Sequence, residues 1–430
     1  MALTDELVDA LAEARARFRS VTDAFEESVL RRQHDVLMSP LLWDLAHIPN
    51  YEDLWLVRAL GGAPTQDGLD GLYDAFQQPR NVREALPLLG LEPAHAYGDA
   101  VRARALERLV DADVSPDAAE PLQRHGFVHS MVAQHEHQHT ETILAAVQLL
   151  PPAEGHQLRA PPTRRGGPIH GDEVLVAGGP FTMGTPDPRA LDNERPPHVV
   201  EVAPFWMDAA PVTNERYQRF IAAGGYEEPT WWTEAGWAWR QEADLTTPKF
   251  WRRDGDGWLR LRFGHLEAVP AGEPVQHVCW YEADAYARWA GRRLPTEPEW
   301  EKAARHDPDT GTSHRWPWGD LEPTSAHANL GHGFLGPAPV GAYPLGVSPS
   351  GCHQMVGDVW EWLASDFLPY PGFQAHPYPE YSAVFFGDGH KMLRGGSWAT
   401  HASVGRVTFR NWDLPIRRQI FAGFRTARSS

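Results

Sequence analysis

The chain is poor in cysteine, in long apolar runs and in positive charge, and each shortage excludes a class of protein. Its 430 residues include only two cysteines, Cys279 and Cys352, so neither a disulfide framework nor a four-thiolate zinc site can form. We expect both to be free or buried thiols. No apolar run approaches the roughly 18 residues that span a bilayer, and the N-terminus lacks the basic start and apolar middle of a signal peptide.

The formal net charge of −18 argues against nonspecific nucleic-acid binding, which needs a basic surface. We therefore expect a cytoplasmic protein with neither nucleic-acid nor membrane partners. Hydrophobic residues make up 42% of the chain and charged residues 22%, which is typical of a soluble globular protein with ample core. A chain of this length predicts two domains.

Residues 1–155 predict a helical domain. Leu7, Leu11, Ala14 and Phe18 recur every three or four residues, which is helical spacing. Further helices are expected at about 40–60, 93–112 and 120–150, and Pro49 should kink or interrupt the first of these three. Four antiparallel helices make a bundle, whose interior can hold metal ligands from facing helices.

The composition of the chain changes after residue 155. Residues 156–171 are rich in proline, glycine and arginine, and we expect a linker there. From 172 to 430 short strands alternate with turns, and two helices are expected near 214–223 and 282–290. This pattern predicts an α+β domain with long loops, and so an α+β multidomain protein overall.

The sharpest local signal is the run HEHQH at residues 135–139. Positions i and i+4 of a helix lie about 40° apart, so His135 and His139 point the same way and can chelate one metal ion. They continue an apolar stripe, which should turn them toward the bundle interior. Gln138 lies on the same side. His137 is expected to point the other way and to be exposed.

A third metal ligand is expected upstream, at His47, which lies among apolar neighbours in the second helix. Three neutral imidazoles leave several coordination positions open, which suits iron(II), although zinc with one water would use the same residues. A zincin protease, with Glu136 as general base, also satisfies the H-E-x-x-H pattern, but its downstream third histidine is missing. The plain alternative is a set of core histidines with ordinary hydrogen-bond partners.

Several motifs resemble one known family. His47 with Tyr51-Glu52, and the run HEHQHTET, resemble the DinB-like helical bundle of EgtB-type sulfoxide synthases of ergothioneine biosynthesis. The C-terminal part resembles the formylglycine-generating-enzyme fold, a C-type-lectin-like α+β domain. The segments that carry this second resemblance are GGPFTMG (178–184), PVTN (211–214), RLPTEPEWE (293–301), GDVWEW (357–362) and LRGGSW (393–398). Together the two parts cover nearly the whole chain in the family's order.

The resemblance implies chemistry that depends on iron(II) and dioxygen. The family joins the thiol sulfur of a cysteine-containing substrate to the imidazole C2 of hercynine (Nα-trimethylhistidine), and the product is a sulfoxide. By position, His47, His135 and His139 correspond to the iron ligands. Tyr378 corresponds to the active-site tyrosine that gives a proton or hydrogen bond to the reacting oxygen, although Tyr381 lies nearby and leaves this assignment open.

The family form that the chain most resembles takes γ-glutamylcysteine as its thiol substrate. The two carboxylates of this dipeptide need cations, and the fork of an arginine side chain binds carboxylates bidentately. An aromatic face or a carboxylate suits the trimethylammonium group of hercynine. The substrate-binding candidates from the resemblance are Arg80, Arg83, Gln138, Trp412, Asp413 and Arg417. We also expect a monomer, and related C-terminal domains raise the question of structural calcium in the loops.

Other functions stay open from the sequence. Formylglycine generation uses a cysteine pair after the Gly-Gly-Ser segment, where Thr400 and Gly405 stand here. Synthases that take free cysteine, of the ergothioneine or ovothiol type, are disfavoured by the arginines and by the lack of a methyltransferase domain. A DinB-like thiol transferase stays open as well, whereas a noncatalytic binding protein is disfavoured by the intact ligand set together with Tyr378.

Overall fold

The computed structural model describes residues 2–155, 157–161 and 164–430, and the chain divides into two compact units. The helical unit comprises Met1–Leu158 with the short segments Asp187–Arg189 and Phe263–His265. The loop-rich unit comprises Arg159–Pro186, Ala190–Arg262 and Leu266–Ser430. Residues 156, 162 and 163 of the predicted linker lie outside the described residues, and the rest of it has neither helix nor strand.

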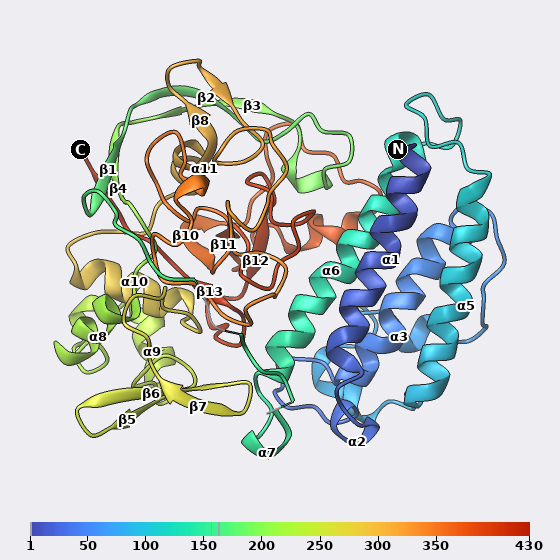
Figure 1. Cartoon of the computed structure of the whole chain (residues 1–430), viewed down its shortest axis with the longest axis horizontal. Coiled ribbons are helices and arrows are strands. Elements are labelled where there is room, and N and C mark those ends of the chain that lie inside the picture. Colours follow the sequence, from blue (N-terminus) through green and yellow to red (C-terminus); the bar gives the residue numbers. More distant parts are fainter. Residues whose placement is uncertain (1, 156, 162–163) are drawn as a thin grey trace. The chain divides into compact units, whose positions relative to one another are not determined.

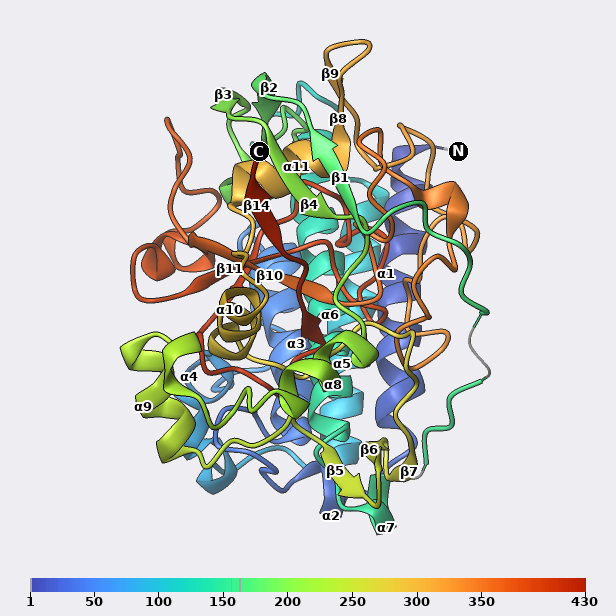
Figure 2. The same cartoon turned by 90° about the vertical axis from the view of Figure 1, so that its left-hand side faces the viewer.

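The four longest helices of the helical unit, α1, α3, α5 and α6, form its bundle and lie side by side in both Figure 1 and Figure 2. Helix α1 packs against α6, and α3 packs against both α5 and α6. The predicted stripe of α1 is buried, because Leu7, Leu11, Ala14 and Phe18 all face the bundle interior. The helices are α1 (Leu3–Thr22), α2 (Glu27–Leu30), α3 (Leu41–Glu52), α4 (Asp70–Tyr73), α5 (Leu91–Val110), α6 (Phe127–Val147) and α7 (Pro152–Gly155).

Helix α3 runs through Pro49 without a break and passes directly into a π-helical segment, Asp53–Arg58. The predicted interruption at Pro49 is therefore wrong. Proline removes one backbone donor and crowds the preceding turn, but every residue of α3 is buried, so packing against α5 and α6 holds the helix together. The bonding changes to π-helical at Asp53, four residues beyond the proline, and such segments often occur at functional sites.

The loop-rich unit contains several short β-sheets of two to four strands. One has the order β1-β4-β14 and another the order β12-β11-β10-β13, in which β13 runs parallel to β10. The strands that build these sheets and the smaller ones are β1 (Glu173–Val176), β2 (Gly179–Met183), β3 (His198–Val202), β4 (Phe205–Asp208), β5 (Trp251–Asp254), β6 (Gly257–Arg262), β7 (His265–Ala268), β8 (His306–Asp307), β9 (Thr312–Ser313), β10 (Trp360–Asp366), β11 (Lys391–Arg394), β12 (Asn411–Asp413), β13 (Ala422–Gly423) and β14 (Ala427–Ser429).

Long loops and buried ion pairs complete this unit. Between β9 and β10, residues 314–359 contain one 3-10 turn and isolated bridges. Arg394 is fully buried and bonds Glu297 at 2.5 Å, which pins α11 to β11. The helices are α8 (Asn214–Ala222), α9 (Glu234–Glu242), α10 (Trp280–Trp289) and α11 (Glu297–Arg305), so the two predicted near 214–223 and 282–290 are confirmed.

Cys279 and Cys352 are both buried free thiols, as predicted. Among the described residues, no helix combines the length and the apolar character that crossing a membrane requires.

Candidate metal centre

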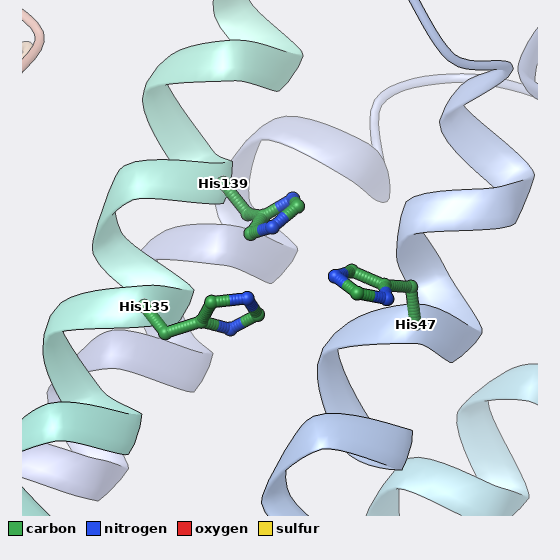
Figure 3. A group of neighbouring side chains, drawn as sticks. All are labelled: His47, His135 and His139. Carbon is green, nitrogen blue, oxygen red and sulfur yellow. The ribbon is translucent and has the colours of Figure 1, made fainter. Parts of the chain in front are cut away.

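Helices α3 and α6 bring His47, His135 and His139 together in the helical unit (Figure 3). One possible ligand atom from each lies within 4.8 Å of the others. The ring centroids are 5.3 Å apart for His47 and His135, 4.8 Å for His47 and His139, and 4.4 Å for His135 and His139. Metal–nitrogen bonds of about 2 Å set ligand nitrogens roughly 3 Å apart, so small side-chain shifts suffice to enclose an ion.

Hydrogen bonds select which nitrogen two of these rings present. The Nδ1 of His47 lies 2.7 Å from the carbonyl oxygen of Tyr73, and the Nδ1 of His139 lies 3.1 Å from a carboxylate oxygen of Asp44. Both oxygens only accept, so each Nδ1 carries the proton and each Nε2 keeps its lone pair for a metal. The Nδ1 of His135 is buried and has no hydrogen-bond partner among the described residues. This donor set fits a metal ion.

Aromatic rings cover two of the candidate ligands. Trp43, His47 and Tyr51 follow one another at intervals of four on α3, so they share one face of the helix. The indole of Trp43 stacks on His47 at 4.3 Å, and the phenol ring of Tyr51 stacks on His135 at 3.8 Å. The two rings hold the imidazole planes in place and keep water from their faces.

Two of the histidines, His47 and His135, are held in the neutral form. Burial lowers the pKa of His47 well below its ordinary value, and the neighbouring His139 lowers it further. Burial and the same neighbour also lower the pKa of His135 well below the ordinary value. Only a neutral imidazole has a lone pair for a metal, so both groups are in the ligating form at neutral pH.

Two residues between the candidate ligands, Glu136 and His137, have surroundings that the sequence does not predict. His137 is 2% exposed, so its predicted exposure is wrong. The reason is that α6 packs against α1 as well as against α3 and has no fully solvated face there. The carboxylate of Glu136 bonds Arg15 and Arg102, so it is committed to an ion-pair network. A zincin general base has to reach the metal's water, and this position does not suit Glu136 for that role.

Arg83 lies close to the histidine group. Its guanidinium carbon is 3.6 Å from the ring centroid of Trp43, and its nitrogens donate to the carbonyls of Gln78 and Ala75 and to the hydroxyl of Ser39. Burial lowers the pKa of Arg83 to about 10, which still leaves it charged at neutral pH. The other candidates of this unit are less enclosed: Arg80 is exposed, and Gln138 is half-buried and donates to the carbonyl of Gln134.

The remaining candidates form a cluster within the loop-rich unit. Trp412 stacks on Phe367 at 4.1 Å, and Tyr381 meets its ring edge-on at 6.1 Å. Tyr378 in turn meets Tyr381 edge-on at 6.3 Å. Next to Trp412 on β12, Asp413 forms an ion pair with Arg417, whose Nε lies 3.1 Å from the carboxylate. The structure thus groups the four candidates of this unit, Tyr378, Trp412, Asp413 and Arg417, around β12.

Sequence reasoning missed several residues that support these groups. Trp43 could have been found from its spacing of four to His47. Asp44 had no such signal, because its partner His139 is on another helix. The same holds for Asp192, which accepts hydrogen bonds from the Ser382 hydroxyl at 2.7 Å and the His376 amide at 3.2 Å, and so holds both ends of the turn that carries Tyr378.

Known proteins resemble this chain along its whole length. Residues 10–143 match the DinB superfamily, and residues 161–430 match the sulfatase-modifying factor enzyme 1-like domain. A hercynine oxygenase of Mycolicibacterium thermoresistibile is 51% identical over 98% of this chain and 94% of its own length. Hercynine oxygenases of Mycolicibacterium smegmatis and Mycobacterium tuberculosis are 49% and 51% identical, each over 99% of both chains. The predicted fold class, a DinB-like bundle followed by a formylglycine-generating-enzyme-like domain, is confirmed.

Proposed function

Because the chain belongs to the hercynine oxygenase family, and is therefore an oxygenase, we propose that it couples γ-glutamylcysteine to hercynine in ergothioneine biosynthesis. The thiol, the imidazole C2–H and one dioxygen give a C–S bond, an S=O bond and one water. The thiol and C2–H each lose a hydrogen, and both leave in the water. Dioxygen takes up all four electrons, so no external reductant is needed.

The observation that carries the proposal is the convergence of three imidazoles without a carboxylate among them. This donor set leaves coordination positions open. It favours iron(II) over magnesium or calcium, because those two ions prefer oxygen ligands. Bound there, iron(II) would supply open positions for a thiolate and dioxygen, and so bring the reacting groups together. His47, His135 and His139 would hold it.

The other candidates bind and orient the substrates in this proposal. Arg80, Arg83 and Arg417 are its candidates for binding the carboxylates of γ-glutamylcysteine, and of these Arg83 is a buried cation near the histidines. Gln138, Trp412 and Asp413 are its candidates for contacts to hercynine. Tyr378 gives its phenolic proton to the reacting oxygen, and general acids of this kind contribute about 10²- to 10⁴-fold in rate.

Anaerobic reconstitution with iron(II) tests this function. Oxygen is then admitted with hercynine and either γ-glutamylcysteine or cysteine, and the product is identified by mass. We expect a coupled product that carries one added oxygen, formed from the dipeptide in preference to cysteine. His47→Ala should abolish it, whereas His95→Gln, a partly exposed histidine of α5, should not. Equal turnover with zinc in place of iron would refute the redox proposal.

A further inference from the structure

A closed ring of four charges joins the four long helices of the bundle. Arg15 of α1 bonds Glu136 of α6 at 2.5 Å and Glu52 of α3 at 2.9 Å. Arg102 of α5 bonds the same two carboxylates, Glu52 at 2.5 Å and Glu136 at 2.7 Å. Two cations and two anions alternate around the ring, so its net charge is zero.

The two carboxylates of the ring are buried, and both arginines are tied to the backbone. Glu52 and Glu136 are 0% and 1% exposed, so solvent hardly screens their ion pairs. Arg15 also donates to the Gly98 carbonyl of α5 at 3.1 Å, and Arg102 donates to the Leu11 carbonyl of α1. Each arginine therefore binds the helix on which the other stands, in addition to both glutamates.

Both glutamates directly follow residues of the histidine site. Glu136 comes after His135, and Glu52 comes after Tyr51, whose ring stacks on His135. Successive residues of a helix point about 100° apart, so the ring and the histidines use different sides of the same two helices. A shift of α3 along α6 could not preserve one group and break the other.

We propose that this ring is a positioning device that fixes α3 against α6, so that the three-histidine site is already formed before a metal ion binds. The inference rests on the proposed function, because it needs the histidines to be ligands. Apolar side chains tolerate small slides of one helix past another, whereas bonded charges at low dielectric hold one arrangement. A buried ion pair adds little stability over well-packed apolar residues, so the fixed arrangement is what the ring contributes.

Cobalt(II) binding to the full-length, metal-free protein tests the inference without turnover. Glu52→Gln keeps the size of the side chain and removes its charge. Its matched control is Asp53→Asn, the next residue, which is also buried but bonds Thr65 and pairs with Arg58 instead of bonding α6. We expect Glu52→Gln to weaken cobalt binding at least tenfold and to alter its visible spectrum. Asp53→Asn should leave both as in the wild type, at a temperature where circular dichroism shows all proteins folded.

If Glu52→Gln does not fold, a variant with four apolar substitutions replaces it in the test. It carries Arg15→Met, Glu52→Leu, Arg102→Met and Glu136→Leu, so no unpaired charge is left in the interior. Weaker cobalt binding by this folded variant supports the inference. Wild-type affinity and spectrum in either ring variant overturn it and leave the proposed function intact. If the wild type itself binds no cobalt, the metal site and the positioning role fail together.

Discussion

Substitution of Asp44 tests whether the histidine group is a metal site with a supporting carboxylate. Asp44 is 2% exposed, and its Oδ1 accepts a hydrogen bond from the Nδ1 of His139 at 3.1 Å. This contact orients the imidazole and makes its other nitrogen, Nε2, a stronger electron-pair donor to a metal ion. Asp44→Ala leaves that N–H without its acceptor, whereas Asp44→Asn keeps a neutral oxygen in its place.

Loss of such a carboxylate partner usually weakens metal binding by about 10- to 100-fold, or roughly 1.4–2.8 kcal/mol. We expect Asp44→Ala to fall in this range and Asp44→Asn to lose less, because the hydrogen bond survives without the charge. Metal affinity is to be measured by competition with a chelator under anaerobic conditions. Substrates are left out, because Asp44 also interacts electrostatically with the proposed carboxylate-binding Arg83.

Asp53→Ala is the control for the loss of a buried carboxylate, because Asp53 is also buried on the same stretch of chain and bonds Thr65 and Arg58 rather than a candidate ligand. An affinity of Asp44→Ala within about twofold of the wild type would refute the reasoning, since at least tenfold is expected. The same result for Asp44→Ala and Asp53→Ala would show that the loss of a buried carboxylate, and not of the contact to His139, is responsible.

Three further predictions concern the substrates, the phenol and pH. Arg83→Ala should raise the KM for γ-glutamylcysteine about 10- to 100-fold, the value of a charged hydrogen bond, and that for hercynine much less; equal effects would contradict the carboxylate role. Tyr378→Phe should lower sulfoxide formation at least about a hundredfold at unchanged metal affinity, with thiol oxidation to the sulfinic acid continuing, whereas Tyr381→Phe should not. Burial lowers the pKa of His129 to about 4. The unfolded chain therefore binds a proton more readily than the folded one below about pH 6.5, and stability is lost as the pH falls. In urea unfolding, the wild type should lose about 2 kcal/mol relative to His129→Leu between pH 7 and pH 5, and parallel pH profiles would refute this.

Much of the helical unit follows from local spacing. The spacing of Leu7, Leu11, Ala14 and Phe18 predicts the buried stripe of α1. The i, i+4 spacing of His135 and His139 predicts that both side chains point the same way. Such patterns report one face of a helix. They do not show whether the opposite face of the helix also packs against a neighbour. The burial of His137 on α6 therefore does not follow from the sequence pattern.

Contacts between distant segments account for the rest. Asp44 and His139 are 95 residues apart, and Glu52 and Arg102 are 50 apart, so no periodicity along the chain could pair them. In the loop-rich unit, Asp192 holds a turn 190 residues away at Ser382. Motif likeness located the candidate residues of that unit, but the contacts that fix them depend on the folded loops.

The run HEHQH illustrates how one short segment takes part in two structures. His135 and His139 turn toward His47, while Glu136 turns toward Arg15 and Arg102. In a zincin the equivalent glutamate acts beside the metal, but here both of its oxygens are bonded to arginines, so the same letters carry a different chemistry. Because Glu136 shares its helix turn with two candidate ligands, a rotation of α6 that moved Glu136 away from the arginines would also turn those imidazoles. The packing of the bundle and the geometry of the metal site are therefore expected to change together.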